Sequence, residues 1–215
     1  MFIKKLFFLT PEEVPIQIEA ELILKSKDET QDCGIIILHP HPQMGGNMDF
    51  KMLHRLSRCL YQAGFDVLRF NFRGVGESEG EFGGGILEGF DFAGAYAFMN
   101  EHGYSKIAAC GYSFGSVVGM SQLLNIPVCA FAAIGFPNTS ATFFENIITP
   151  KKISTPTMFI SGENDEFSEL SKITEQFEFE FMPEVVIIDN EDHFFLKKWQ
   201  ELAEDVAGFM LKHLN

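Results

Sequence analysis

Basic side chains are scarce in this chain of 215 residues, which has 16 Lys and Arg against 30 Asp and Glu and a formal net charge of −14 at pH 7. Proteins bind the phosphates of nucleic acids and of anionic lipid surfaces mainly through Lys and Arg, which displace counterions. The charge balance therefore argues against nucleic acid and against an anionic membrane surface as partners.

Long apolar runs are also missing. The longest ones are far shorter than the ~20 residues that a membrane helix needs. Near the start, the only apolar run is Leu6 to Leu9, followed by the acidic pair Glu12 and Glu13. Such a run is too short for the apolar part of a signal peptide. We therefore expect a soluble, cytoplasmic protein without stable membrane insertion.

Paired cysteines are the third absence. Cys33, Cys59, Cys110 and Cys129 are widely spaced and form no CxxC pair. Thiols of cytoplasmic proteins are normally reduced, and this spacing indicates neither a zinc site nor a redox dithiol. We expect all four to be small core residues.

What the chain does have is an alternation of short β-rich runs with longer helical runs, which is typical of a parallel sheet covered on both faces. With 46% apolar and 21% charged residues it can bury a full core. The sequence predicts an α/β fold with an N-terminal hairpin at 5–10 and 16–25, joined by a turn at 11–15. No internal repeat or linker divides the chain, so we expect a single domain of residues 1–215.

The predicted elements follow from the apolar periodicity. Continuous apolar runs predict buried strands at 34–38, 66–70, 107–111, 128–135, 157–161 and 185–189. Spacings of three and four residues predict helices at 49–63, 86–102, 113–124, 169–177 and 196–214. The stretch 177–181, Phe-Glu-Phe-Glu-Phe, alternates like a strand although it follows a helical run. Most of the 24 phenylalanines are expected in the core, and some could line an apolar acyl pocket.

The sharpest motif is Gly-Tyr-Ser-Phe-Gly at 111–115, directly after a predicted strand and directly before a predicted helix. This is the G-x-S-x-G nucleophile elbow in the context that it requires. The glycines are needed because the serine occupies a strained turn, where side chains two residues away would collide with the neighbouring strand or helix. The motif predicts that Ser113 is a nucleophile.

A serine hydroxyl needs a base, and the base needs an orienting acid. Of the six histidines only His193 and His213 follow Ser113, and His213 lies in the last helix near the terminus. His193 follows the last apolar strand on a polar loop and is the predicted base. The predicted acid is Asp165, on the loop after the strand at 157–161, with Glu163 and Glu166 as close alternatives.

Acyl transfer also needs two N–H donors for the oxyanion, one of them usually from the residue after the nucleophile. That residue is Phe114. The second donor should come from the loop 39–46, where two prolines have no N–H. We favour His41, with Gln43 or Met44 as alternatives. A zinc site on the same loop, built from His39, His41, Asp49 and His54, is a weaker alternative because it leaves the elbow unexplained.

These features together resemble the α/β-hydrolase superfamily, in particular the small, lidless branch near the dienelactone hydrolases and uncharacterised bacterial hydrolases. The resemblance covers most of the chain and rests on five segments, at 39–46, 69–80, 111–115, 162–165 and 192–195. It implies the α/β-hydrolase fold with a minimal lid or none. It also implies nucleophile, base and acid at Ser113, His193 and Asp165 in that chain order, and an oxyanion hole at His41 and Phe114. Dienelactone hydrolases use a cysteine nucleophile, whereas this chain has serine, which favours a general ester over a lactone.

The segment 73–80 resembles a phosphate-binding loop only superficially, because it lacks the Lys-Ser/Thr ending of a P-loop and the G-x-G-x-x-G spacing. We interpret it as a tight turn that could bring Arg73 or Glu77 near the site.

The sequence therefore predicts a serine esterase without cofactor or metal, whose partner is a small-molecule ester. About 20 residues, 136–155, precede the strand that carries the acid, which leaves little room for a lid. The apolar pairs at 143–144 and 147–148 could still form a short flap. Thioester or amide hydrolysis, acyl transfer to another acceptor, and a non-catalytic binding module are the alternatives.

Overall fold

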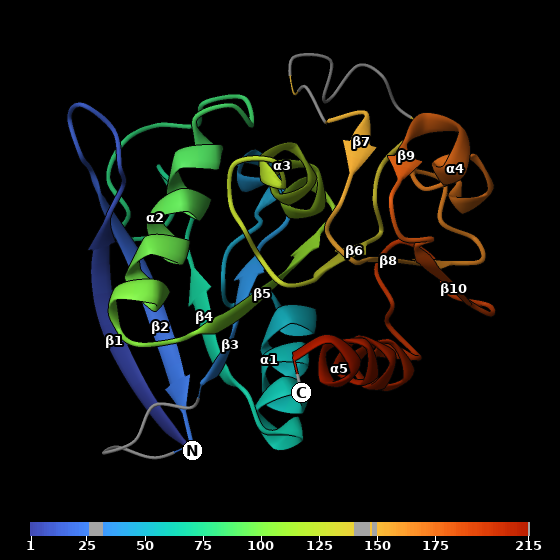
Figure 1. Cartoon of the computed structure of the whole chain (residues 1–215), viewed down its shortest axis with the longest axis horizontal. Coiled ribbons are helices and arrows are strands. Elements are labelled where there is room, and N and C mark those ends of the chain that lie inside the picture. The colour runs from blue at the N-terminus through green and yellow to red at the C-terminus, as the bar shows by residue number, and fades with distance from the viewer. Residues whose placement is uncertain (26–31, 140–146, 148–149, 215) are drawn as a thin grey trace.

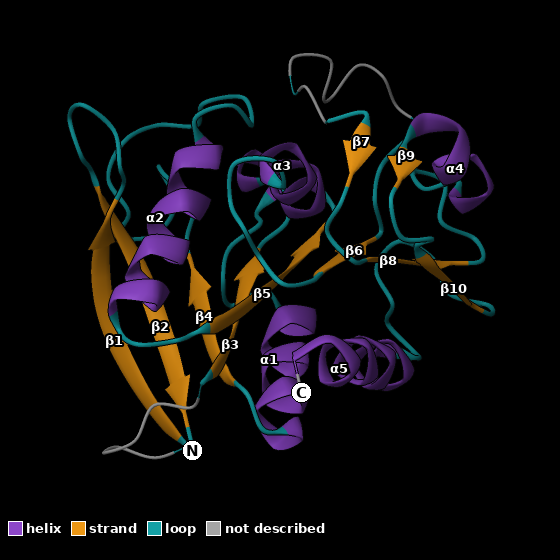
Figure 2. Cartoon of the chain, in the orientation of Figure 1, coloured by secondary structure: helices purple, strands orange, loops and turns teal. Residues whose placement is uncertain are grey.

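The structure is a computed structural model that describes residues 1–25, 32–139, 147 and 150–214. Its centre is an eight-stranded sheet with the order β1-β2-β4-β3-β5-β6-β8-β10 (Figures 1 and 2). Strand β2 runs antiparallel to both of its neighbours, and all other neighbouring pairs are parallel. The strands are β1 (Phe2–Leu9), β2 (Gln17–Leu24), β3 (Cys33–Leu38), β4 (Asp66–Phe70), β5 (Lys106–Tyr112), β6 (Phe131–Ile134), β8 (Thr157–Gly162) and β10 (Glu184–Ile188).

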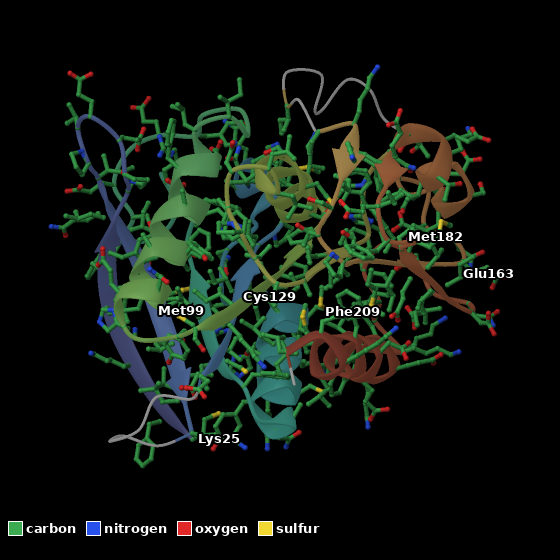
Figure 3. The ribbon with its side chains drawn as sticks, in the orientation of Figure 1. Lys25, Met99, Cys129, Glu163, Met182 and Phe209 are labelled. Carbon is green, nitrogen blue, oxygen red and sulfur yellow. The ribbon has the colours of Figure 1, made fainter. Side chains whose placement is uncertain are left out.

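Helices cover both faces of this sheet because side chains alternate along each buried strand. In β3, Ile35 and Ile37 pack on one face, where α1 (Lys51–Ala63) and α5 (Trp199–Leu214) lie. Ile36 and Leu38 pack on the other face, under α2 (Glu88–Glu101) and α3 (Phe114–Gln122). Figure 3 labels one buried side chain from each core, Met99 on α2 and Phe209 on α5. The predicted α/β fold is thus confirmed.

The N-terminal hairpin is confirmed as well. Strands β1 and β2 pair along their whole length, from Phe2 opposite Leu24 to Leu9 opposite Gln17. The N–H of Thr10 donates to the carbonyl of Ile16 at 3.1 Å and closes the turn. All six predicted buried strands are also found, although β6 is shorter than predicted.

The predicted helix at 169–177 is wrong in its extent. The structure has a 3-10 turn at Leu170–Lys172 and a single helical turn, α4 (Ile173–Gln176). The chain turns to extended backbone at Phe177, whose ring packs against Phe136 and Phe159, so burial of this ring ends the helix. Only two residues of the stretch 177–181 form a strand, β9 (Glu178–Phe179), and it pairs with β7 (Lys152–Ile153), which the sequence did not predict.

Between β6 and β8, the described residues contribute β7 and a few irregular stretches. The expected flap at 143–144 and 147–148 lies outside the described residues except for Ile147, which is buried in the core under α2 and α3. In the described part of the chain, no helix is long and apolar enough to cross a membrane. The four cysteines are free thiols; Cys110 is fully buried and the others are half-buried.

Candidate active site

The chain passes from β5 to α3 at the carboxyl end of the central strands (Figure 1). Ser113 lies in the sharp turn between these two elements. Its backbone has φ 53° and ψ −118°, which is strained for a residue with a side chain. A Cβ on Gly111 would come within 2.3 Å of the carbonyl oxygen of Gly115, and a Cβ on Gly115 within 2.5 Å of that of Leu38. The two glycines of the motif are therefore required by backbone packing on either side of the serine.

The structure brings Ser113, His193 and Asp165 together from three separate loops. The Nε2 atom of His193 lies 3.0 Å from Oγ of Ser113, and its Nδ1 atom lies 2.8 Å from Oδ2 of Asp165. A carboxylate can only accept, so Nδ1 carries the proton and Nε2 is left to accept from the serine hydroxyl. This arrangement lets the imidazole remove the serine proton.

Two hydrogen bonds, besides the one with His193, hold the carboxylate of Asp165 in place. Its Oδ2 atom accepts from the Ser161 hydroxyl at 2.9 Å, and its Oδ1 atom accepts from the N–H of Phe167 at 2.9 Å. The two alternatives lie elsewhere. Glu163, labelled at the periphery of the molecule in Figure 3, is exposed and accepts from the N–H of Asn190. Glu166 is exposed as well. The structure thus places Asp165, rather than either glutamate, against His193.

Hydrogen bonds and a ring contact fix the loop that carries His193. The hydroxyl of Tyr112 donates to the backbone carbonyl of His193 at 2.7 Å, and the two rings stack with centroids 5.4 Å apart. The buried carboxylate of Glu191 accepts from the N–H groups of Lys197 and Lys198. The N–H of Asn164 donates to the Glu191 carbonyl, so the acid loop and the histidine loop are joined directly. The other histidine after Ser113, His213, is on α5 and lies 3.9 Å from Glu184.

The loop 39–46 lies beside Ser113 and is closed by hydrogen bonds of its own. The carbonyl of His41 accepts from the N–H groups of Met44 and Gly46, and its Nδ1 atom accepts from the N–H of Gln43. The N–H groups of both alternative oxyanion donors, Gln43 and Met44, are therefore occupied. Among the described residues, no group accepts from the N–H of His41. Its ring packs against the ring of Phe114, 5.0 Å away between centroids.

A cavity of about 380 Å³ opens over Ser113. Four aromatic rings line it, together with Ser113, His193 and residues of the loop 39–46. The lining residues are Pro40, His41, Met44, Gly46, Phe50, Tyr112, Ser113, Phe167, His193 and Phe194.

No family model matches the chain. An uncharacterised protein of Rickettsia prowazekii is 30% identical over 188 residues, which are 82% of this chain and 77% of that protein. A solved structure of a protein of unknown function from Agrobacterium tumefaciens, provisionally assigned as an α/β hydrolase, is 30% identical with a TM-score of 0.77, over 99% of this chain and 97% of that one.

A solved structure of an α/β serine hydrolase homologue from Coxiella burnetii is 25% identical with a TM-score of 0.80, over 95% of this chain and 96% of the other. A lidless serine hydrolase from Xanthomonas campestris, 24% identical, has the same fold with a TM-score of 0.80, over 98% of this chain and 95% of the other. The chain belongs to the α/β-hydrolase superfamily.

The weaker metal alternative does not assemble in this α/β hydrolase. His39 is fully buried, its Nδ1 atom donates to the Pro40 carbonyl, and its Nε2 atom accepts from the N–H of Phe72. Burial lowers the pKa of His39 to about 4, so the ring is neutral. His54 Nδ1 faces Nη1 of Arg69 at 3.2 Å, and Asp49 is exposed. Within the described ranges, no three His, Cys, Asp or Glu side chains are placed to hold a metal ion.

In this α/β hydrolase, side chains of the segment 69–80 hydrogen-bond to the backbone beside the cavity. Asn71 Oδ1 accepts from the N–H of Met48, and Arg69 Nη1 donates to the Met48 carbonyl. Met48 lies between Gly46 and Phe50, which both line the cavity. Arg73 does not reach the cavity, because it pairs with Asp91 and Glu12, and Glu77 is exposed.

Sequence reasoning missed Tyr112, Glu191 and the pair Arg69 and Asn71. Tyr112 stands next to the nucleophile inside the motif, so its position was a usable signal. For the others the signal was weak, because their partners are backbone groups from distant segments.

Proposed function

We propose that this α/β hydrolase is a serine hydrolase that cleaves a carboxylic ester of a small or exposed substrate through an acyl-enzyme intermediate. The observation that carries the proposal is the hydrogen-bonded series from Ser113 through His193 to Asp165. The Coxiella burnetii relative is described as a serine hydrolase homologue, which supports the reaction class.

In the first half of the reaction, His193 Nε2 takes the proton of Ser113 as Oγ attacks the ester carbonyl. Asp165 holds the imidazole in the Nδ1–H tautomer and stabilises the imidazolium that forms. The tetrahedral intermediate collapses as the imidazolium gives its proton to the leaving alcohol, and Ser113 keeps the acyl group. Water then attacks the acyl-enzyme with the same proton transfers and restores the free serine.

The oxyanion that forms in each half-reaction needs two N–H donors. We assign these to His41 and Phe114. Their rings pack together beside Ser113, and the N–H groups of the alternatives Gln43 and Met44 are held inside the loop. Loss of one such donor typically lowers kcat by about 100- to 1000-fold.

The cavity is open beside exposed Met44 and Phe194, which favours substrates that need no lid to be held. Thioester hydrolysis uses the same groups, and parallel turnover of an ester and a thioester with the same acyl group separates the two.

The test is labelling with a fluorophosphonate, followed by intact mass, on the wild type and on Ser113→Ala, His193→Ala and Ser121→Ala. Ser121 is the matched control, a half-buried serine on α3 whose hydroxyl donates to the Val118 carbonyl. We expect one adduct on the wild type and on Ser121→Ala, and none on the other two. A folded wild type that stays unlabelled and turns over no ester would make the protein a binding module instead.

A further inference from the structure

We propose that the cavity over Ser113 selects an uncharged, apolar acyl group and rejects one that carries a carboxylate. This inference rests on the proposed function, because it names the substrate class of the same site. The acyl group is the part concerned, since it stays on Ser113 after the alcohol has left and must fit the cavity in both half-reactions.

The cavity wall offers an acyl group rings and a thioether. Phe50, Tyr112, Phe167 and Phe194 contribute aromatic surface, and Met44 lies at the rim. Such a wall gains from burying alkyl or aryl groups and gives nothing to an anion.

The polar side chains of the wall carry no fixed positive charge. The Tyr112 hydroxyl donates to the His193 carbonyl. His41 accepts from the N–H of Gln43 at Nδ1, so its proton is on Nε2 and the ring is neutral. Burial lowers the pKa of His41 and keeps it neutral near pH 7.

No cation lines the cavity within the described residues. The arginines nearest in the sequence to its loops are committed elsewhere: Arg69 pairs with Glu21, Arg73 with Asp91 and Glu12, and Arg55 lies over the Trp199 ring. The sequence from 136 to 150, which follows β6, contains no Lys or Arg.

A carboxylate in this cavity would therefore lose its water without gaining a cationic partner, which is strongly unfavourable. The net charge of −14 repels an anion before it arrives.

The test compares two esters of nearly identical shape with the same leaving group. These are 4-nitrophenyl 4-methylpentanoate and mono-4-nitrophenyl succinate, in which a carboxylate replaces the terminal isopropyl group. Spontaneous hydrolysis is measured with Ser113→Ala and subtracted. We expect kcat/KM for the uncharged ester to be at least about 100-fold higher, and the methyl ester of the succinate to recover most of the difference.

Two variants of Met44 test the cause. Met44 is exposed, so both should fold. Because Met44 itself lines the cavity, the readout is the ratio of kcat/KM for the succinate to kcat/KM for the 4-methylpentanoate ester within each variant. Met44→Arg should raise this ratio by about tenfold or more over the wild type, and Met44→Glu should lower it.

The two proposals fail in different ways. If the wild type is labelled at Ser113 and hydrolyses both esters within about threefold of each other, the selectivity is refuted and the serine hydrolase stands. If the wild type is neither labelled nor active on either ester, the proposed function fails and the selectivity with it.

Discussion

Replacing Tyr112 by Phe removes one oxygen atom and tests how the base is positioned. That hydroxyl donates to the His193 carbonyl, and burial with the nearby carboxylates of Asp165 and Asp192 raises the pKa of Tyr112, so the donor keeps its proton. Its loss leaves a buried carbonyl unpaired, which costs about 1–3 kcal/mol of unfolding free energy. A displacement of the imidazole by about 1 Å can cost about 100-fold in rate. We expect kcat to fall by about 10- to 100-fold, with KM changed by less than about threefold.

The chain offers a matched control in Tyr104→Phe. Tyr104 and Tyr112 are each 1% exposed, and the Tyr104 hydroxyl donates to Asp66 at 2.9 Å, away from the site. Urea unfolding should show that both variants lose stability, whereas steady-state turnover of 4-nitrophenyl butyrate should fall only for Tyr112→Phe. If Tyr112→Phe loses stability but keeps kcat within about twofold, the hydroxyl supports the fold and does not position His193.

Three further predictions concern other groups. Asp165→Asn should lower kcat by about 10⁴-fold, because an amide favours the wrong imidazole tautomer; near-normal turnover would point to another acid. Asn71→Leu should raise KM for the 4-methylpentanoate ester by about tenfold, because the N–H of Met48 loses its acceptor and the cavity wall shifts; fluorophosphonate labelling at saturation should continue, and an unchanged KM would contradict the role. His39 has its pKa lowered to about 4 from 6.5 by burial, so the unfolded state takes up a proton first as pH falls and stability is lost from about pH 6.5 down to pH 4. Urea unfolding should show the wild type losing about 2 kcal/mol more than His39→Gln between pH 7.5 and pH 5; equal losses would refute this.

The central strands could be predicted because they are buried on both faces and read as continuous apolar runs. The strand at 66–70 matches β4 residue for residue. The helix at 169–177 failed for a tertiary reason, since its apolar spacing suits a helix but the Phe177 ring is drawn into a cluster with Phe136 and Phe159. The two-residue strand β7 has no period to detect.

The candidate site likewise has residues that the sequence predicts and residues that it does not. Ser113 and His193 could be placed from motif and chain order, because each follows a predicted strand whose carboxyl end lies at one edge of the sheet. The sequence favours Asp165 but leaves Glu163 and Glu166 open, because the choice depends on how one turn directs three neighbouring carboxylates. The hydrogen bonds that Arg69 and Asn71 form with the backbone of Met48 could not be predicted, since they join the end of β4 to a loop about twenty residues earlier in the sequence.

Two residues of the cavity wall lie outside the core, and this bears on how the protein can change. Met44 and Phe194 line the cavity but are 74% and 51% exposed. Substitutions at such positions usually alter stability by less than about 0.5 kcal/mol. New acyl preferences are therefore open to evolution and to laboratory selection at these two positions, while the strained serine turn and both cores stay intact.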